Sequence, residues 1–290
     1  MDHPILPQNA ALLLEGGSLR GLYTAGALDT LMEENIYFPA VAGVSAGALN
    51  GVNYVARQPG RAASINLRYR HDPRYFGPRA AFNGGSVFGL RFMLYDVPRE
   101  VPFDADTFYN GGQRMIAVAT NVQTGKAAYF EKGKTEFDFM EACRASASLP
   151  LASTPVRLGQ NTYLDGGCAC PIPLQWALDE GFAKIAVITT REKGFRKKLP
   201  SQRMVNLYDD FYGDNALFLA TMLTQETRYN ALMDELDALE EAGRVFVLRP
   251  AQPVDIGRFE GDMDKLLALY NRGRREMRER LAALRAYLEG

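Results

Sequence analysis

The amino-acid sequence predicts a three-layer α/β/α fold, in which helices cover both faces of a mostly parallel central sheet. Two observations support this prediction. Short continuous apolar runs recur along the chain, and such runs are typical of strands that are buried on both faces. The first two runs, at residues 10–14 and 39–42, each lead into a glycine-rich turn and then into residues with helical spacing. We therefore expect the two turns to lie side by side on a parallel sheet.

The first turn, Gly16-Gly17-Ser18-Leu19-Arg20-Gly21, follows the strand at residues 10–14. Such a turn presents backbone N–H groups to an anion at the start of a helix. Its glycine spacing matches neither of the common nucleotide-binding patterns. Taken alone, the turn is equally consistent with a tight strand–helix connection.

The second turn, Gly43-Val44-Ser45-Ala46-Gly47, has the pattern Gly-x-Ser-x-Gly. A strand before it and a small-residue helix after it are the context of a nucleophile elbow, in which a serine occupies a sharp, strained turn. The elbow places Ser45 at a helix N-terminus, where negative charge is favoured. Five residues alone are a weak pattern, so the rest of the chain has to support it.

Residues 59–72 have a helical pattern, whereas residues 73–112 are rich in proline, glycine and aromatics without a clear period. An irregular stretch of this length inside a compact domain is often a lid or a binding wall. Two interpretations of its aromatic residues stay open, because they could line an apolar pocket or simply pack a long loop. These residues are Tyr75, Phe76, Phe82, Phe88, Phe92 and Tyr95.

The second half of the chain continues the alternation of strands and helices. Strands are predicted at 114–120, 127–131, 156–158, 162–164, 184–190 and 244–248, and helices at 135–146, 214–242 and from 263 to 288, the last with a pattern interrupted at Arg274. Between them, residues 191–203 hold six basic residues and one acidic residue. This basic run is either a solvated loop or a contact with anionic head groups.

Asp165 ends one of these strands and is followed by Gly166 and Gly167. The pattern places a carboxylate on a turn at a strand end. A purely structural role is also open, since aspartate in such a turn can cap the helix that follows.

A serine nucleophile requires a base, and the sequence contains few candidates. The α/β-hydrolases use a histidine that follows the serine and the acid in the chain. This chain has only His3 and His71, and neither position fits that order. Either the elbow is not catalytic, or its base is a carboxylate.

The three glycine motifs, taken in order, resemble the patatin-like phospholipase family and in particular its compact bacterial members. The resemblance implies a Ser–Asp dyad without histidine, with Ser45 as the nucleophile and Asp165 as the base. It also implies an oxyanion hole in the first turn, through backbone N–H groups at about Gly17 and Ser18. The expected site residues are Ser45 and Asp165, the oxyanion turn Gly16, Gly17, Ser18, Arg20 and Gly21, and the elbow residues Gly43, Ala46 and Gly47.

One departure from the family pattern is Ser18, which stands where many members have a further glycine. The nearby Cys168 and Cys170 would need more ligands to hold a metal, and none follows them. We therefore expect neither a metal nor a cofactor.

The expected function is the hydrolysis of lipid acyl esters, on a phospholipid or a lysophospholipid. An enzymatic alternative is a small-ester carboxylesterase or thioesterase, if residues 73–112 form a shallow pocket. A non-enzymatic alternative is a catalytically silent regulatory protein at a membrane surface. The expected partner is thus a lipid or acyl-ester substrate, with no nucleic acid.

The remaining observations concern size and location. The 290 residues are 47% hydrophobic and 23% charged, with a net charge of −1, which is ordinary for a globular protein and gives no sign of nucleic-acid binding. With no repeat or linker in view, we expect a single domain over 1–290 whose part from 205 to 290 is largely helical. Residues 35–56 are uncharged and long enough to span a bilayer, but their glycines and asparagines favour a buried strand, the elbow and a helix.

Three cysteines fit reduced thiols in a cytosolic protein. The N-terminus lacks a signal-peptide pattern. A cytoplasmic location is therefore expected, with peripheral contact to a membrane as a second expectation.

Overall fold

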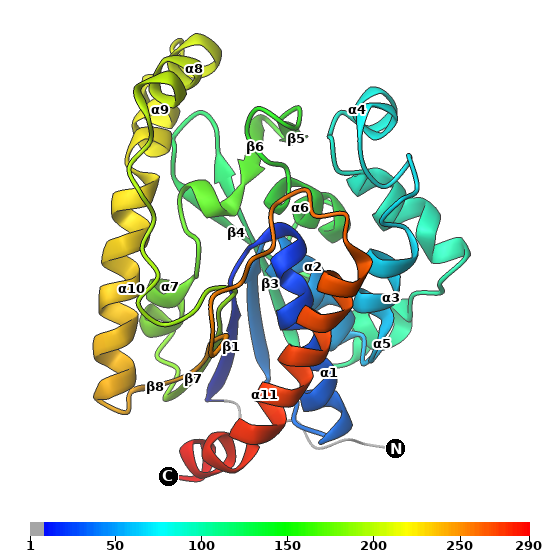
Figure 1. Cartoon of the computed structure of the whole chain (residues 1–290), viewed down its shortest axis with the longest axis vertical. Coiled ribbons are helices and arrows are strands. Elements are labelled where there is room, and N and C mark those ends of the chain that lie inside the picture. The colour runs from blue at the N-terminus through cyan, green and yellow to red at the C-terminus, as the bar shows by residue number, and fades with distance from the viewer. Residues whose placement is uncertain (1–8) are drawn as a thin grey trace.

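The computed structural model describes residues 9–290 and places one eight-stranded sheet at its centre (Figure 1). The N-terminal residues, for which no signal peptide is expected and which include His3, lie outside the described part of the chain. The strands are β1 Ala10–Leu14, β2 Ala40–Val44, β3 Arg114–Asn121, β4 Ala127–Glu131, β5 Val156–Leu158, β6 Asn161–Asp165, β7 Lys184–Ile188 and β8 Val245–Leu248. Four strand pairs are parallel, namely β1–β2, β1–β7, β2–β3 and β7–β8. The other pairs of the described sheet, β3–β4, β3–β6 and β5–β6, are antiparallel.

Helices connect the strands and cover both faces of the sheet. The helices are α1 Gly21–Glu33, α2 Ala46–Val55, α3 Arg61–Arg68, α4 Pro78–Gly84, α5 Ala105–Asn110, α6 Phe139–Ser146, α7 Leu174–Asp179, α8 Gln202–Tyr212, α9 Ala216–Leu223, α10 Gln225–Glu241 and α11 Met263–Glu289. Four short turns of helix complete the secondary structure, η1 Ser18–Arg20, the π-helical η2 Phe92–Asp96, η3 Val97–Arg99 and η4 Gly166–Cys168.

Successive residues of β1 point to opposite sides of the sheet and divide the interior into two cores. Leu12 and Leu14 belong to the core formed with α1, α2 and α11. Ala11 and Leu13 belong to the core formed with α7 and α10. Figure 1 shows α7 and α10 on one side of the sheet and α1, α2 and α11 on the other. The predicted three-layer α/β/α fold is thus confirmed.

The pairing of β3 explains how Asp165 reaches Ser45. One edge of β3 is occupied by β4, which pairs with residues 116–120. Both β2, which pairs with 114–118, and β6, which pairs with 119–121, must therefore lie along the other edge. In this register β6 ends just beyond the end of β2, so the carboxylate and the elbow meet at one point.

Helix α11 crosses α1 at two glycines. A Cβ atom on Gly26 would overlap the carbonyl oxygen of Tyr270, and a Cβ on Gly273 would overlap that of Tyr23. The backbones of the two helices are thus in direct contact. Two buried hydrogen bonds flank the crossing, from Tyr23 to Glu276 (2.9 Å) and from Tyr270 to Asp29 (2.7 Å).

The structure differs from the sequence prediction in the C-terminal part. The helix expected over 214–242 is two helices, α9 and α10, which meet at Thr224. Helix α11 runs unbroken through Arg274, whose guanidinium pairs with Glu33 (2.6 Å). Over the described residues, no helix is both long and apolar enough to cross a membrane. The uncharged stretch at 35–56 contains β2, the elbow and α2.

Candidate active site

Ser45 stands between β2 and α2 in a backbone conformation that is rare for a residue with a side chain. Its φ of 54° and ψ of −122° lie outside the regions that non-glycine residues prefer, which costs about 1–3 kcal/mol. The glycines around it are required by close packing. A Cβ on Gly43 would lie 2.6 Å from the backbone nitrogen of Ala48, and a Cβ on Gly47 would overlap the carbonyl oxygen of Leu14. These are the features that the elbow pattern predicts.

Ser146, which the sequence did not single out, holds the backbone of Ser45. The N–H of Ser45 donates to Ser146 Oγ (2.9 Å), and the Ser146 hydroxyl donates to the carbonyl oxygen of Val118 (2.6 Å). Ser146 is fully buried at the end of α6. The hydroxyl therefore ties the strained turn to β3.

Asp165 is buried, with 4% of its surface exposed, at the end of β6. Its Oδ1 accepts the N–H of Gly167 (2.8 Å), and the Thr120 hydroxyl donates to its main-chain carbonyl oxygen (2.8 Å). Its N–H donates to the carbonyl oxygen of Ser148 (2.7 Å). Its Oδ2 is buried and accepts no hydrogen bond of normal geometry from the described residues. The carboxylate is thus fixed in place with one oxygen available.

The pKa of Asp165 is raised, chiefly by burial, which disfavours the charged form. An interaction with the Ser45 side chain and the N–H of Gly167 act in the opposite direction. The approach of the Ser45 hydroxyl is close enough to stabilise the carboxylate, although it falls short of a normal hydrogen bond. In enzymes without substrate such contacts are often long.

The first glycine-rich turn lies against the elbow, as the sequence predicts. A Cβ on Gly16 would lie 3.0 Å from Ser45 Cβ, and a Cβ on Gly21 would lie 2.9 Å from Ala46 Cβ. Ser18, where many family members have glycine, has a φ of 49°, a value that favours glycine. In the described part of the chain, the N–H groups of Gly17 and Ser18 donate no hydrogen bond. They are therefore free to bind an anion.

Glu15, which sequence reasoning missed, is buried directly behind this turn. Its Oε2 accepts the N–H (2.5 Å) and the hydroxyl (3.1 Å) of Thr190, and its Oε1 accepts the hydroxyl of Tyr229 on α10 (3.0 Å). The Thr190 hydroxyl is also within hydrogen-bond distance of the Gly16 carbonyl oxygen (3.1 Å). The only signal in the sequence is an acidic residue at the end of an apolar strand. The network ties α10 to the glycine-rich turn.

Two cavities meet at Ser45, and Ser18 and Leu149 line both. The first, of about 130 Å³, has walls that are mainly aliphatic and aromatic, and we call it the apolar pocket. Its lining includes Leu22, Leu49, Ile65, Tyr75, Phe88 and Leu90. The second, of about 630 Å³, is polar, and we call it the polar cleft. It contains Asp165 and five basic side chains, Arg20, Arg191, Lys197, Lys198 and Arg258.

The aromatic residues of 73–112 divide between the two interpretations. Tyr75 and Phe88 line the apolar pocket. Tyr75 also packs in a small core with Phe92 and Tyr69. Phe82 is 92% exposed. This segment is therefore partly a pocket wall and partly a packed loop.

Of the other polar candidates, Cys168 lines the polar cleft with Asp165, whereas Cys170 is not among the described residues that line either cavity. His71 is exposed and is not among the described residues that line the two cavities. Cys168 is buried, and Cys170 donates to the carbonyl oxygen of Ile172 (3.4 Å). Over residues 9–290, no group of three or more histidine, cysteine, aspartate or glutamate side chains is arranged to hold a metal ion.

Comparisons with known proteins place this site in a family. A family model described as patatin-like phospholipase matches residues 12–178. A second model, a domain of unknown function (DUF6363), matches residues 215–289. The first match contains the glycine-rich turn, the elbow and Asp165.

Two relatives and one solved structure are similar to the chain. The uncharacterized protein YjjU of Escherichia coli (strain K12) is 28% identical over 87% of this chain and 71% of its own length. The probable lipid hydrolase 463L of Invertebrate iridescent virus 6 is 26% identical over 58% of this chain and 62% of its own length. The crystal structure of VipD from Legionella pneumophila aligns with 96% of this chain and 67% of its own chain, at a TM-score of 0.45 and 12% identity.

The patatin-like match spans more than half of the chain and all three glycine motifs. The protein therefore belongs to the patatin-like phospholipase family and is a hydrolase.

Proposed function

We propose that the protein cleaves lipid acyl esters by means of a Ser45–Asp165 dyad and an acyl-enzyme intermediate. The observation that carries this proposal is the position of Ser45 at the junction of the apolar pocket and the polar cleft, beside Asp165. An acyl chain in the apolar pocket brings its ester carbonyl to the serine, and the alcohol part then occupies the cleft.

In the first step, Ser45 Oγ attacks the ester carbonyl carbon while its proton passes to the available oxygen of Asp165. The tetrahedral intermediate collapses, and the alcohol leaves with that proton. Water then attacks the acyl-enzyme and gives one proton to Asp165. Asp165 passes this proton to Ser45 Oγ as the carboxylic acid leaves, which restores the free enzyme. Partial removal from water suits Asp165 to this role, because a raised pKa makes a carboxylate a better proton acceptor.

The free N–H groups of Gly17 and Ser18 are the proposed oxyanion hole. They lie on the turn that packs against Ser45, so they can stabilise the charge that develops on the carbonyl oxygen. One such donor contributes roughly 3–4 kcal/mol to transition-state stabilisation in well-studied hydrolases. Glu15 and Tyr229 support the turn from behind.

A fluorophosphonate probe tests the nucleophile. We expect the probe to label the wild-type protein, and Ser45→Ala to abolish both labelling and hydrolysis. Equal labelling of Ser45→Ala would refute the assignment. A series of esters of increasing acyl length separates a lipid hydrolase from a small-ester carboxylesterase or thioesterase. The apolar pocket predicts a rate that rises with chain length, whereas a rate that falls beyond short chains favours the alternative.

We also propose that the rim of the site contacts a membrane surface. Helices α4 and α8 project from the same end of the molecule (Figure 1). The loop between α6 and β5 contacts the ends of both helices. Its Thr154 N–H donates to the carbonyl oxygen of Gly85, which follows α4 (2.6 Å), and its Leu151 N–H donates to the hydroxyl of Tyr212 on α8 (3.0 Å). Large exposed apolar side chains lie on these elements and on α9, namely Phe82, Leu151, Phe211 and Leu217.

Liposome flotation tests the membrane proposal. We expect Phe82→Ser combined with Phe211→Ser to weaken binding to vesicles. The control is Leu267→Ser, since Leu267 is also exposed (45%) but lies on α11. Equal binding of both variants and the wild type would contradict the proposal. We further propose that the chain forms one domain, because β8 of the C-terminal part pairs with β7 in the same sheet.

A further inference from the structure

We propose that the polar cleft beside Ser45 binds the phosphate of the leaving alcohol, so that the enzyme prefers acyl esters with an anionic phosphate head group. Because the ester must be cleaved at Ser45, this inference rests on the proposed function. The side chains that would recognise the phosphate are Arg20, Lys197 and Arg258, with Arg191 and Lys198 at the same cleft.

The first argument is that these cations lack partners. In the described structure the side chains of Arg20, Lys197 and Arg258 form neither an ion pair nor a hydrogen bond. The Nε of Arg20 is fully buried without an acceptor. A buried charged group without a partner is costly, and a bound anion would remove that cost for Arg20. Arg258 is exposed and is available to bind an anion.

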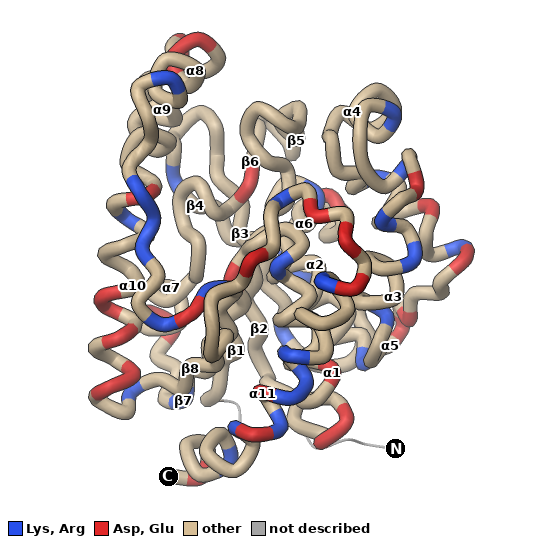
Figure 2. The backbone as a smooth tube through the Cα atoms, viewed as in Figure 1, with Lys and Arg blue, Asp and Glu red and all other residues tan. Residues whose placement is uncertain are grey.

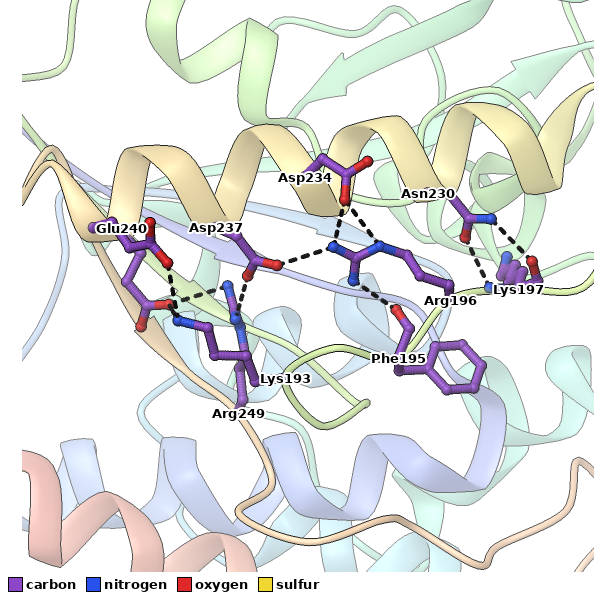
Figure 3. Close-up of polar contacts among 10 residues, drawn as sticks. Lys193, Phe195, Arg196, Lys197, Asn230, Asp234, Asp237, Glu240 and Arg249 are labelled. Atoms are coloured by element: carbon purple, nitrogen blue, oxygen red, sulfur yellow. Dashed lines mark hydrogen bonds and ion pairs between the residues drawn. The ribbon is translucent and has the colours of Figure 1, made fainter.

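Neighbouring cations of the basic run, unlike Lys197, form ion pairs with acidic side chains (Figure 3). Arg196 pairs with Asp234 (2.5 Å) and Asp237 (3.0 Å), and Lys193 lies 3.7 Å from Glu240. These acidic residues belong to α10, beside which the loop between β7 and α8 runs (Figures 1 and 2). The ion pairs anchor the loop, and they leave Lys197 and Lys198 for the cleft.

Lys197 is held in position by two further contacts. The side chain of Asn230 accepts the Lys197 N–H (2.7 Å) and donates to the Lys197 carbonyl oxygen (2.9 Å) (Figure 3). The Lys197 ammonium lies 4.3 Å from the centre of the Tyr229 ring, a cation–π contact that neutralises no charge. The ammonium is thus preorganised, which lowers the entropy that binding would cost.

The electrostatics of the cleft are consistent with an anion between these groups. Burial, together with the charge of Arg191, lowers the pKa of Arg20 to about 10, and burial also lowers the pKa of Lys197. Burial thus disfavours the charged form of both side chains, and a bound anion would favour it. Among the charges that lower the pKa of Asp165 are those of Arg258 and Lys197, so both lie close to the reaction centre.

The acidic residues of the cleft do not cancel this charge. The lining holds five basic side chains and three carboxylates, which are Glu15, Asp165 and Glu226. The charges of Glu15 and Glu226 favour the charged form of Lys197, and that of Glu15 also favours the charged form of Arg20. Five basic groups against three acidic ones still leave the cleft positive. Because the acyl chain occupies the apolar pocket, the group that enters the cleft is the alcohol part. A phosphate monoester presents several charged oxygens to several donors, whereas a choline head group adds a cation to a positive cleft.

Steady-state kinetics with soluble monomeric substrates tests the inference. The substrates are a 1-acylglycerol 3-phosphate, its choline ester and the monoacylglycerol, all with the same short acyl chain. The readout is the ratio of kcat/KM for the phosphate monoester to that for the monoacylglycerol. We expect this ratio to exceed ten in the wild type. Lys197→Gln and Arg258→Gln should each lower it about tenfold, the effect of losing one hydrogen bond to a charged group.

Arg275→Gln is the matched control, since Arg275 is an exposed α11 arginine outside the described lining of the cleft. The ratio should keep its wild-type value in this variant. Arg258 is exposed, so its replacement tests the inference even if Lys197→Gln fails to fold. We also expect glycerol 3-phosphate to inhibit monoacylglycerol hydrolysis competitively and more strongly than inorganic phosphate.

The outcomes separate this inference from the proposed function. Full monoacylglycerol hydrolysis by Ser45→Ala would refute the proposed function itself. Hydrolysis that depends on Ser45 but has a ratio near one would overturn only the phosphate site. An equal loss on all three substrates in Lys197→Gln and Arg258→Gln would mean that the cations act on Asp165. Inhibition by inorganic phosphate but not by glycerol 3-phosphate would indicate a site for free anions. This result, like the equal loss on all three substrates, would overturn the inference.

Discussion

Replacing Ser146 by alanine would test how the protein holds Ser45, the proposed nucleophile. The Ser146 hydroxyl accepts the N–H of Ser45 (2.9 Å) and donates to the Val118 carbonyl oxygen (2.6 Å). The variant leaves the Ser45 N–H buried without an acceptor, at a cost of about 1–3 kcal/mol. Including the lost bond to Val118, we expect a destabilisation of about 2–3 kcal/mol. For a chain of this size that lowers Tm by roughly 5 °C.

The same change should impair catalysis, because Ser45 occupies a strained conformation that its N–H helps to fix. A displacement of about 1 Å at a reacting group can lower the rate a hundredfold. We therefore expect kcat on a p-nitrophenyl ester to fall by about tenfold or more, with a smaller change in KM. The assays are calorimetric unfolding and steady-state hydrolysis at one temperature well below both Tm values.

Ser148→Ala provides the control in the same segment. The Ser148 hydroxyl is a donor to the Arg144 carbonyl oxygen (2.8 Å) in the preceding turn of helix and does not contact Ser45. Its loss should cost less than about 1 kcal/mol and leave kcat near the wild-type value. If Ser146→Ala matches Ser148→Ala in both Tm and kcat, the hydroxyl does not hold the elbow and the reasoning is wrong.

Three further predictions follow from the site. Because burial raises the pKa of Asp165, kcat/KM should fall as the pH drops through that raised pKa, and Asp165→Asn should lose activity by orders of magnitude. A raised carboxyl pKa favours folding at low pH, and this contribution is lost as the pH rises through the folded-state value. Asp165→Asn should thus be at least as stable as the wild type in thermal unfolding at pH 7, and a lower Tm would contradict this. Gly47→Ala should lower the free energy of unfolding by about 1–3 kcal/mol or more, because the new Cβ would overlap backbone atoms. Gly84→Ala should not lower it, because the nearest atom to a Cβ there, Arg91 Cβ, is 4.0 Å away. Denaturant unfolding distinguishes the two variants. Tyr229→Phe removes a donor to buried Glu15 and should lower the free energy of unfolding by about 1–3 kcal/mol; an unchanged unfolding midpoint would show that the bond is dispensable.

The parts of the site that the sequence predicts are those with local causes. The elbow needs glycine at 43 and 47 because strand and helix backbones meet there. These requirements appear as short patterns within a few residues. The absence of a suitable histidine left a carboxylate as the alternative base, and the family resemblance implied that it is Asp165. The register of β3 explains why Asp165 lies beside Ser45.

The parts that the sequence could not predict depend on distant partners. The bond from Tyr229 to Glu15 joins residues 214 positions apart, and it forms only because α10 packs under the sheet. The basic run at 191–203 could not be divided into anchoring and unpaired cations, since the acids that bind Arg196 lie on α10. Likewise, the apolar spacing of 214–242 continues past Thr224, although the helix does not.

The crossing of α1 and α11 has a consequence for how the chain is made. Strand β1 and helix α1 leave the ribosome long before α11, yet the groove at Gly26 is filled by residues around Gly273. Until those residues emerge, α1 and the glycine-rich turn at its start have an uncovered apolar flank. The nascent chain therefore cannot complete this packing before α11 has been synthesised. Premature termination before α11 would release a product prone to aggregation rather than a shorter enzyme.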